Sequence, residues 1–192
     1  MYDTILISIV ILFIYIFIFL NRHNVAYIES YKGDRYMVYK DEYQKEKSDM
    51  LAKILENMFI LKNHLVNNMN NFPGYSEYIK QLNDNFDENK TIVYETDPAS
   101  DLTSYSVNKG EELSFCLKSK KNGKLHTMNL LMYVAIHEIS HIACPEIGHG
   151  ELFKKIFKKF ADEATKIGIY KYEDYSATPV EYCGMILSSS IL

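Results

Sequence analysis

Two histidines one helical turn apart place the strongest constraint on how this chain can fold. Residues 127–143 have apolar side chains at the three- and four-residue spacing of an amphipathic helix, and Pro145 follows soon after. His137 and His141 lie four residues apart in this segment, so a helix presents both rings on one face, one turn apart. The sequence therefore predicts a helix with two imidazole rings side by side.

This spacing allows two imidazoles to bind one tetrahedral metal ion, with metal–nitrogen distances of about 2.0–2.1 Å for zinc. Glu138 follows the first histidine directly and is rotated away from the ligand line, so it can contact a metal-bound water without coordinating the metal. The H-E-x-x-H pattern thus indicates that His137 and His141 bind a zinc ion (Zn2+) and that Glu138 is a general base. A pair of core or surface histidines without metal is the alternative.

A catalytic zinc needs a third protein ligand and an open fourth position. His149 is the main candidate, because the break after residue 143 lets the chain turn back just before the next helix, which begins near Gly150 and stops at Gly168. The competing candidates in the same part of the chain are Glu163, Glu146 and Cys144. The spacing of the three cysteines supports no zinc site built from thiolates.

Such a site has a known chemistry. Zinc lowers the pKa of bound water, Glu138 accepts a proton as the water attacks a carbonyl carbon, and the proton then passes to the leaving amine. Tyr175 and Tyr182 lie in the part of the chain where an assisting donor is expected. Residues 113–118 could form a sheet edge to which an extended peptide adds as a strand, and an ordinary buried strand is the alternative.

The remaining apolar patterns predict a mixture of helices and strands. The predicted segments are an extended pair around Gly33 in residues 27–40, helices in residues 41–70 and 75–86, a strand in residues 91–96, and a hairpin in residues 105–118. His64, in the first of these helices, is interpreted as a structural or exposed residue rather than a ligand. The overall class is therefore α+β.

The N-terminal end carries an uncharged run, residues 5–20, that is about as short as a transmembrane helix can be. A cleaved signal peptide fits less well, because Asp3 replaces a basic n-region and Ala26 is the only small residue near a cleavage site. We therefore predict a transmembrane anchor in residues 1–21, with membrane contact through residues 4–20.

Charge and cysteine content suggest where the rest of the chain lies. Arg22, Lys32 and Arg35 follow the apolar run, which places residues 28–192 on the cytosolic side of a single-pass membrane protein. The cysteines, Cys116, Cys144 and Cys183, form no C-x-x-C pair, and free thiols in a reducing compartment are the simpler interpretation. The net charge of −4 implies no strongly basic surface, so nucleic acid is not the expected partner.

These motifs resemble a known family. "HEISH", the histidine that begins "HGELF", and Phe153 four residues after that histidine are similar to the WLM and SprT-like zinc peptidases, which have a minimal zincin domain. From about residue 28 to the C-terminus, stretches such as "TSYSVNKGEELSFCLKS" and "IGIYKYEDYSATPVEYCGMIL" look like metallopeptidases encoded by large DNA viruses and some algae.

The resemblance implies a zincin-like domain over residues 28–192, with a small mixed β-sheet packed on the H-E-x-x-H helix. It implies His137, His141 and His149 as metal ligands and Glu138 as base, and it places "YCGM" (residues 182–185) inside the domain. Some relatives cut proteins crosslinked to DNA, whereas this chain is acidic and shows no DNA-binding appendage.

The predicted function is a membrane-anchored zinc metallopeptidase that acts on a peptide or protein substrate. One alternative is a protease that acts on DNA-crosslinked proteins, for which DNA binding that weakens with salt would be the signature. The other is a non-catalytic membrane-anchored scaffold whose metal is structural or absent.

Overall fold

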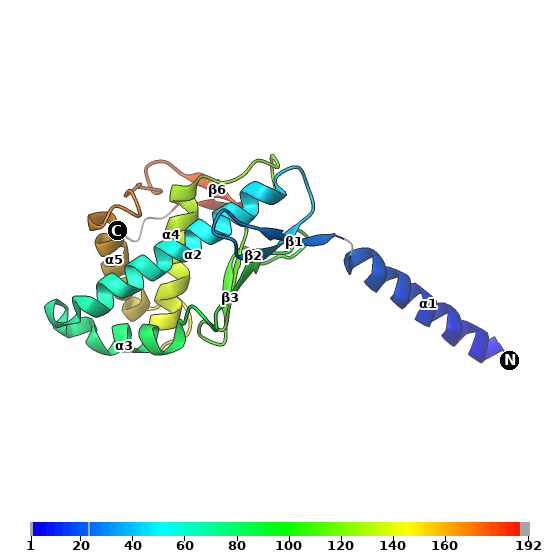
Figure 1. Ribbon diagram of the computed structural model, residues 1–192, viewed down its shortest axis with the longest axis horizontal. Helices are drawn as coiled ribbons and strands as arrows, with labels where there is room; N and C mark the ends of the chain where they lie inside the picture. The colour runs from blue at the N-terminus through cyan, green and yellow to red at the C-terminus, as the bar shows by residue number, and fades with distance from the viewer. Residues whose placement is uncertain (1, 23, 189–192) are drawn as a thin grey trace.

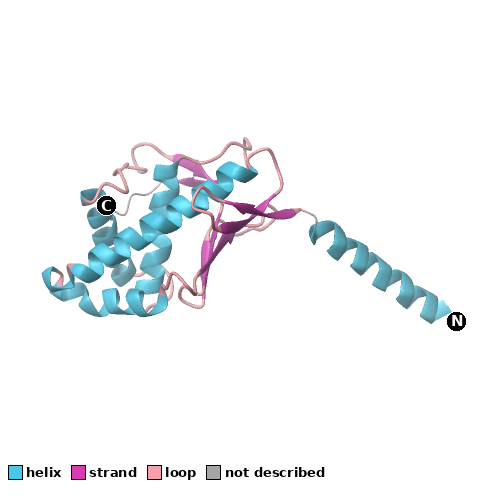
Figure 2. Ribbon diagram, viewed as in Figure 1, coloured by secondary structure: helices cyan, strands magenta, loops and turns pink. Residues whose placement is uncertain are grey.

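The apolar patterns of the sequence produce five helices and seven strands over residues 2–22 and 24–188, the part of the chain that the computed structural model describes (Figure 2). The helices are α1 (Tyr2–Arg22), α2 (Gln44–Asn67), α3 (Ser76–Asn85), α4 (Met128–Ala143) and α5 (Glu151–Lys166), with 3-10 turns at Met69–Asn71 and Pro73–Tyr75. The strands are β1 (Val25–Glu29), β2 (Arg35–Tyr39), β3 (Ile92–Glu95), β4 (Tyr105–Val107), β5 (Glu112–Phe115), β6 (Val180–Tyr182) and β7 (Met185–Leu187). The predicted α+β class is confirmed.

The main sheet is mixed, as predicted, with the strand order β1-β2-β3-β5-β4. β1 and β2 form an antiparallel hairpin, β2, β3 and β5 run parallel, and β4 returns antiparallel to β5. Of the two interpretations of residues 113–118, the buried strand is confirmed and the sheet edge is wrong. β5 lies between β3 and β4, and Leu113 and Phe115 are fully buried. The edge strand near the candidate site is β4.

The helices α2, α3, α4 and α5 gather on one side of the strands β1, β2 and β3 (Figure 1). α2 packs across β1, β2 and β3, whereas α4 packs against α2, α3 and α5 and meets the sheet at β4. The sheet therefore contacts the H-E-x-x-H helix α4 at β4, while α2 covers the strands β1, β2 and β3. α4 is the central helix of the core, with Leu131, Ala135 and Ile139 fully buried.

Both ends of α4 are fixed by side chains. The Thr127 hydroxyl caps the first turn by accepting a backbone N–H at 3.3 Å. At the other end the Lys109 ammonium donates to the carbonyl oxygens of His141 and Cys144, at 3.0 and 2.5 Å. Gly110, next to this lysine, has a φ of 113°, and a Cβ there would lie 3.1 Å from the Ile142 side chain of α4 and 3.0 Å from the Asn85 backbone oxygen of α3. The β4–β5 turn therefore docks tightly on the end of α4.

A disulfide overturns part of the cysteine interpretation. Cys116, just after β5, is bonded to Cys183, in the β6–β7 turn, with a Cα–Cα distance of 6.0 Å. The prediction of free thiols is wrong for these two residues and right for Cys144, which is free and buried. The two cysteines are 67 residues apart in the sequence, so no local pattern predicts their pairing, and only the fold brings them together. The bond attaches the two-stranded β6–β7 sheet to the main sheet.

Removing this disulfide should destabilise the fold. A Cys116→Ser/Cys183→Ser variant is expected to lose about 2–4 kcal/mol of unfolding free energy, because the open chain gains freedom in its unfolded state. Denaturant unfolding of the wild type with and without a thiol reductant should show the same difference. A Cys144→Ser variant should keep the reductant sensitivity, and a wild-type protein whose midpoint ignores the reductant would contradict the prediction.

The predicted N-terminal helix is present, and Figure 1 shows α1 leading away from the remaining chain. In the part of the chain that the structure describes, however, no helix combines the length and the apolarity that crossing a membrane requires. The predicted anchor in residues 1–21, its membrane contact through residues 4–20 and the single-pass location with a cytosolic domain are therefore corrected. The uncharged run is at the lower limit of the length that a transmembrane helix needs, so the sequence alone gave little support for an anchor.

The predicted domain, residues 28–192, falls largely within the described residues. After α1, the first strand of the main sheet, β1, begins at Val25. Residue 1, at the start of the predicted anchor, and residues 189–192, at the end of the predicted domain, lie outside the described residues. The boundary at residue 28 stays a prediction.

Candidate metal centre

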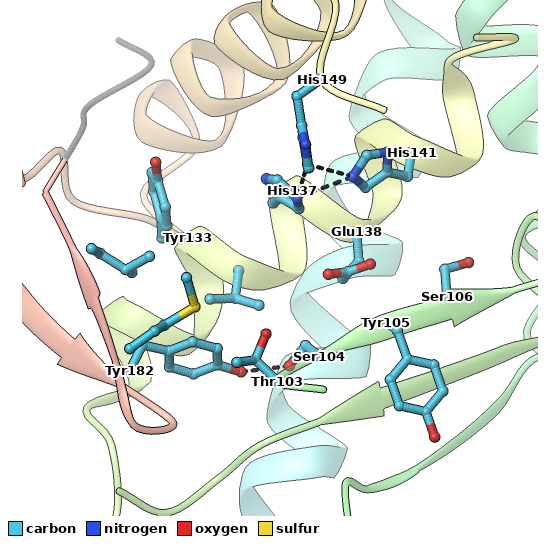
Figure 3. A pocket seen from close by; sticks show the side chains of 13 residues that line it. Thr103, Ser104, Tyr105, Ser106, Tyr133, His137, Glu138, His141, His149 and Tyr182 are labelled. Carbon is cyan, nitrogen blue, oxygen red and sulfur yellow. Dashed lines mark hydrogen bonds between the residues drawn. The ribbon is translucent and has the colours of Figure 1, made fainter. Parts of the chain in front are cut away.

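Three imidazole rings converge on one point at the surface of α4. His137 and His141 come from α4, and His149 comes from the loop that precedes α5. Their Nε2 atoms are separated by 3.1 Å (His137–His141), 3.1 Å (His141–His149) and 3.0 Å (His137–His149), and Figure 3 shows the rings pointing toward one another. Nitrogens that share a tetrahedral zinc ion lie about 3.3–3.4 Å apart. The spacing therefore fits one shared metal ion.

The loop between the helices brings His149 back to α4. Cys144 leaves the helix in an extended conformation, and Gly148 has a φ of 87°, which favours glycine. Gly150 then caps α5. Phe153, in the first turn of α5, is fully buried and stacks on the His141 ring with a centroid distance of 4.1 Å. The turn after α4 thus positions His149, and Phe153 fixes the ring of His141.

The charge state of the rings suits a metal ligand. Burial and the neighbouring imidazoles lower the pKa of His137 to about 3. Burial, His149 and the Lys109 ammonium lower the pKa of His141 to about 4. Both rings are therefore neutral at pH 7, as binding of a metal ion requires. A cation shared by the three Nε2 atoms would satisfy their lone pairs together.

Glu138 lies beside the histidines and is not part of their cluster. Its side chain is only 5% exposed and lines a cavity of about 430 Å³ that the three rings also border. Figure 3 shows its carboxylate in the cavity, between the rings and Ser106. Burial raises the pKa of Glu138 to about 8, and a cation held by the rings would lower it again.

The competing third ligands are not part of this cluster. Among the described residues, the group that could share one ion at this point consists of His137, His141 and His149, without Glu146 or Cys144. Glu163 instead contacts His64, with its Oε2 2.9 Å from Nε2, so His64 has the structural role that was predicted.

Glu163 is also bound by two lysines on its own helix. Its Oε1 accepts from Lys159 at 2.8 Å and from Lys166 at 2.7 Å. Burial alone would raise the pKa of Glu163, but the hydrogen bonds from Lys159, Lys166 and His64 outweigh it and lower the pKa to about 2. The stabilisation is therefore complete above the unfolded-state pKa and is lost as the pH falls toward 2.

The two tyrosines named as possible donors lie in different places. Tyr182 borders the cavity, and its hydroxyl is 2.5 Å from the Ser104 hydroxyl. Burial raises the pKa of Tyr182, so its hydroxyl keeps its proton. Tyr175 is not among the residues that line the cavity and packs edge-on against Tyr133, at a centroid distance of 4.9 Å.

The sequence did not identify the remaining walls of the cavity. They come from β4 and the residues before it, from β7, and from α4. The lining residues that the sequence missed are Thr103, Ser104, Tyr105, Ser106, Tyr133, Val134, Met185 and Leu187. Met185, Ile186 and Leu187 are all apolar, so no alternation in the sequence marks the outer two as lining residues.

Fold and site together define a mixed α+β protein with a three-histidine cluster that could hold a metal ion. No family model matches the sequence. The chain is 37% identical over 195 residues to the uncharacterized protein R325 of Acanthamoeba polyphaga mimivirus, covering 100% of this chain and 98% of that protein. The chain therefore belongs to the family of this viral protein.

Two shorter similarities are also viral. Protein 136R of Invertebrate iridescent virus 6 is 36% identical over 84 residues, which cover 43% of this chain and 47% of that protein. Protein 042R of Invertebrate iridescent virus 3 is 32% identical over 93 residues, which cover 48% of this chain and 54% of that protein. The predicted resemblance to proteins of large DNA viruses is confirmed.

Two solved structures are similar in part, and both are of Wss1 from Saccharomyces cerevisiae. The first has a TM-score of 0.37 at 18% identity and covers 48% of this chain and 74% of that chain. The second, a mutant, has a TM-score of 0.38 at 16% identity and covers 53% of this chain and 82% of that chain. Scores this low carry no inference about chemistry, so the WLM and SprT-like resemblance stays a prediction.

Proposed function

We propose that this protein is a zinc-dependent peptidase in which His137, His141 and His149 hold one zinc ion and Glu138 is the general base. The observation that carries the proposal is the convergence of three Nε2 atoms, 3.0–3.1 Å apart, beside a buried carboxylate in an open cavity. Zinc bound there would lower the pKa of a water molecule and polarise the substrate carbonyl.

The residues around the ion have separate roles in metal binding and proton transfer. His137 and His141 are neutral and would bind the ion without losing a proton, and Phe153 keeps the His141 ring in place. Glu138 accepts a proton from the attacking water and gives it to the nitrogen of the leaving amine. Because its carboxylate is buried, bulk water does not compete for that proton. General base catalysis of this kind contributes about 10²–10⁴-fold to the rate.

The edge strand β4 gives the substrate a place beside these groups. In the described sheet β4 is paired on one side only, with β5. Residues 103–106, at and before β4, line the cavity together with Glu138 and the three rings. An extended peptide added along this edge would lie across the histidine cluster, and main-chain hydrogen bonds would hold it independently of its sequence.

The alternatives have weaker support. A structural metal would have its fourth position closed by a further protein ligand such as a thiol, yet Cys183 is in a disulfide and Cys144 lies outside the histidine cluster. For a protease that acts on DNA-crosslinked proteins we would expect basic charge, whereas the chain carries a net charge of −4. Peptide hydrolysis is therefore the function that we propose.

Removing the metal should abolish the activity. The purified chain is expected to cut an unfolded protein such as casein, to lose this activity after treatment with a chelator, and to regain it when zinc is added back. Gel electrophoresis of the casein fragments over time measures the rate. A zinc-loaded, folded protein that cuts neither casein nor a mixed peptide library would refute the proposal.

A further inference from the structure

The cavity beside the three histidines has an apolar end. Met185 and Leu187, two residues apart on β7, line it, whereas Ile186 between them does not. Tyr133 and Val134 of α4 also line the cavity. Figure 3 shows Tyr133 and Tyr182 at one end of the cavity and His141 and Ser106 at the other. The cavity thus joins a polar end, at the histidines, to an apolar end, at β7.

The apolar end carries no charge that could pair with a charged ligand. Apart from the three rings and Glu138, the cavity is lined by neutral side chains. Met185 is 47% exposed, so a bound apolar ligand would cover surface that now faces water. A charged group placed here would lose its water without gaining a partner, whereas an apolar group would gain by burial.

The β6–β7 hairpin is held firmly enough to form a wall. Its strands pair only with each other in the described residues, so other bonds must position it. The Cys116–Cys183 disulfide attaches its turn, and the Cys183 backbone N–H donates to His126 Nε2 at 3.2 Å. The Tyr182 hydroxyl bonds to Ser104, directly before β4. The wall is therefore fixed in place before any substrate binds.

We propose that Met185, Leu187, Tyr133 and Val134 form a specificity subsite for one large apolar side chain of the substrate, such as Leu, Met or Phe, next to the bond that is cut. The proposal rests on the proposed peptidase function. A peptide along β4 would have its main chain beside Glu138, and a side chain turned from that main chain would enter the apolar end. The subsite then selects the residue at one position, while β4 binds the rest without selection.

A peptide series in which one residue varies tests this subsite. The series places Leu, Met, Phe, Ala, Asp or Lys at the position next to the cleaved bond, and kcat/KM is measured for each peptide. The wild type should prefer Leu, Met and Phe over Ala and Asp by about tenfold or more. Met185→Lys should remove most of this preference and raise kcat/KM for the Asp peptide relative to kcat/KM for the Leu peptide.

Ile186→Lys is the matched control, because Ile186 lies on the same strand, is 50% exposed and does not line the cavity. It should keep the wild-type preference within about twofold, since solvent-exposed substitutions away from a site have small effects. Leu187→Ser gives a second variant if Met185→Lys does not fold. Equal kcat/KM values across the series, or the same loss of preference in Ile186→Lys and Met185→Lys, would overturn the subsite.

Binding separates this proposal from the peptidase proposal. The Glu138→Gln variant should bind fluorescent Leu peptides more tightly than Asp peptides, as measured by anisotropy, even though it does not cut them. Selective binding without any wild-type cleavage would support the subsite and refute the peptidase. Cleavage without selection would refute the subsite and support the peptidase, and the absence of both binding and cleavage would refute both.

Discussion

Replacing Glu138 with glutamine should lower kcat/KM for peptide hydrolysis by about 10²–10⁴-fold while the chain keeps its metal. Glutamine has nearly the same shape as glutamate, so the cavity and the three rings stay in place. Its amide cannot accept the proton of the attacking water, however, and the base is lost. Steady-state kinetics and metal content, measured on the same preparation, check both halves of the expectation.

Glu146→Gln is the matched control for this substitution. Glu146 lies in the loop between His141 and His149, is exposed and does not line the cavity. Its replacement should leave kcat/KM within about twofold of the wild type, because an exposed substitution of this kind has little effect on the fold. A Glu138→Gln protein that keeps wild-type kcat/KM would show that another group removes the proton.

Replacing His149 with alanine should lower the affinity for zinc by more than about 100-fold. Only two of the three converging nitrogens would then remain, both on α4, and zinc sites of this kind need three protein ligands. The loss should also appear in thermal unfolding. Zinc raises the melting temperature of the wild type because it binds the folded state, and it should not raise that of His149→Ala.

Glu163→Ala distinguishes this ligand from its main competitor. Loss of the Glu163 carboxylate breaks its contacts with His64, Lys159 and Lys166, so the variant should be less stable by about 1–3 kcal/mol. It should nevertheless bind zinc with wild-type affinity in a competition titration below its melting temperature. A Glu163→Ala protein that loses its zinc, beside a His149→Ala protein that keeps it, would reverse the assignment.

Local sequence patterns were sufficient to predict most of the fold and the centre of the site. The apolar spacing predicted α2, α3, α4 and α5 close to their observed bounds, because α2, α3 and α5 each bury one face and α4 is buried over most of its surface. His137 and His141 followed from helical geometry alone. His149 followed from the proline and glycine in the loop, since they force the chain to turn back toward α4.

Contacts between distant segments were not predictable in the same way. The Cys116–Cys183 bond depends on how β5 and the β6–β7 turn meet in space. The same is true of Lys47, which is only 1% exposed and lies 2.8 Å from a carboxylate oxygen of Asp41 and 2.8 Å from one of Glu95. A buried lysine in an amphipathic helix looks like a surface residue until the partner strands are known.

The walls of the cavity also depend on contacts between distant segments, so the sequence did not predict them. Tyr133, on α4, sits on the apolar pattern of the helix and also borders the cavity. Met185 and Leu187 come from a strand of three residues, which is too short for a reliable pattern. The apolar run at the N-terminus is the reverse case, a feature that the sequence suggested and the structure does not support. Its composition suggested a membrane span, but its length is at the limit of what a span requires.

The most direct test of the central claim, that three histidines share one ion, is X-ray absorption at the zinc edge on the purified, zinc-loaded protein. We expect one zinc per chain with three histidine nitrogens at about 2.0–2.1 Å, one further oxygen and no sulfur. A folded chain that retains no zinc, or a spectrum with sulfur at about 2.3 Å, would contradict the account.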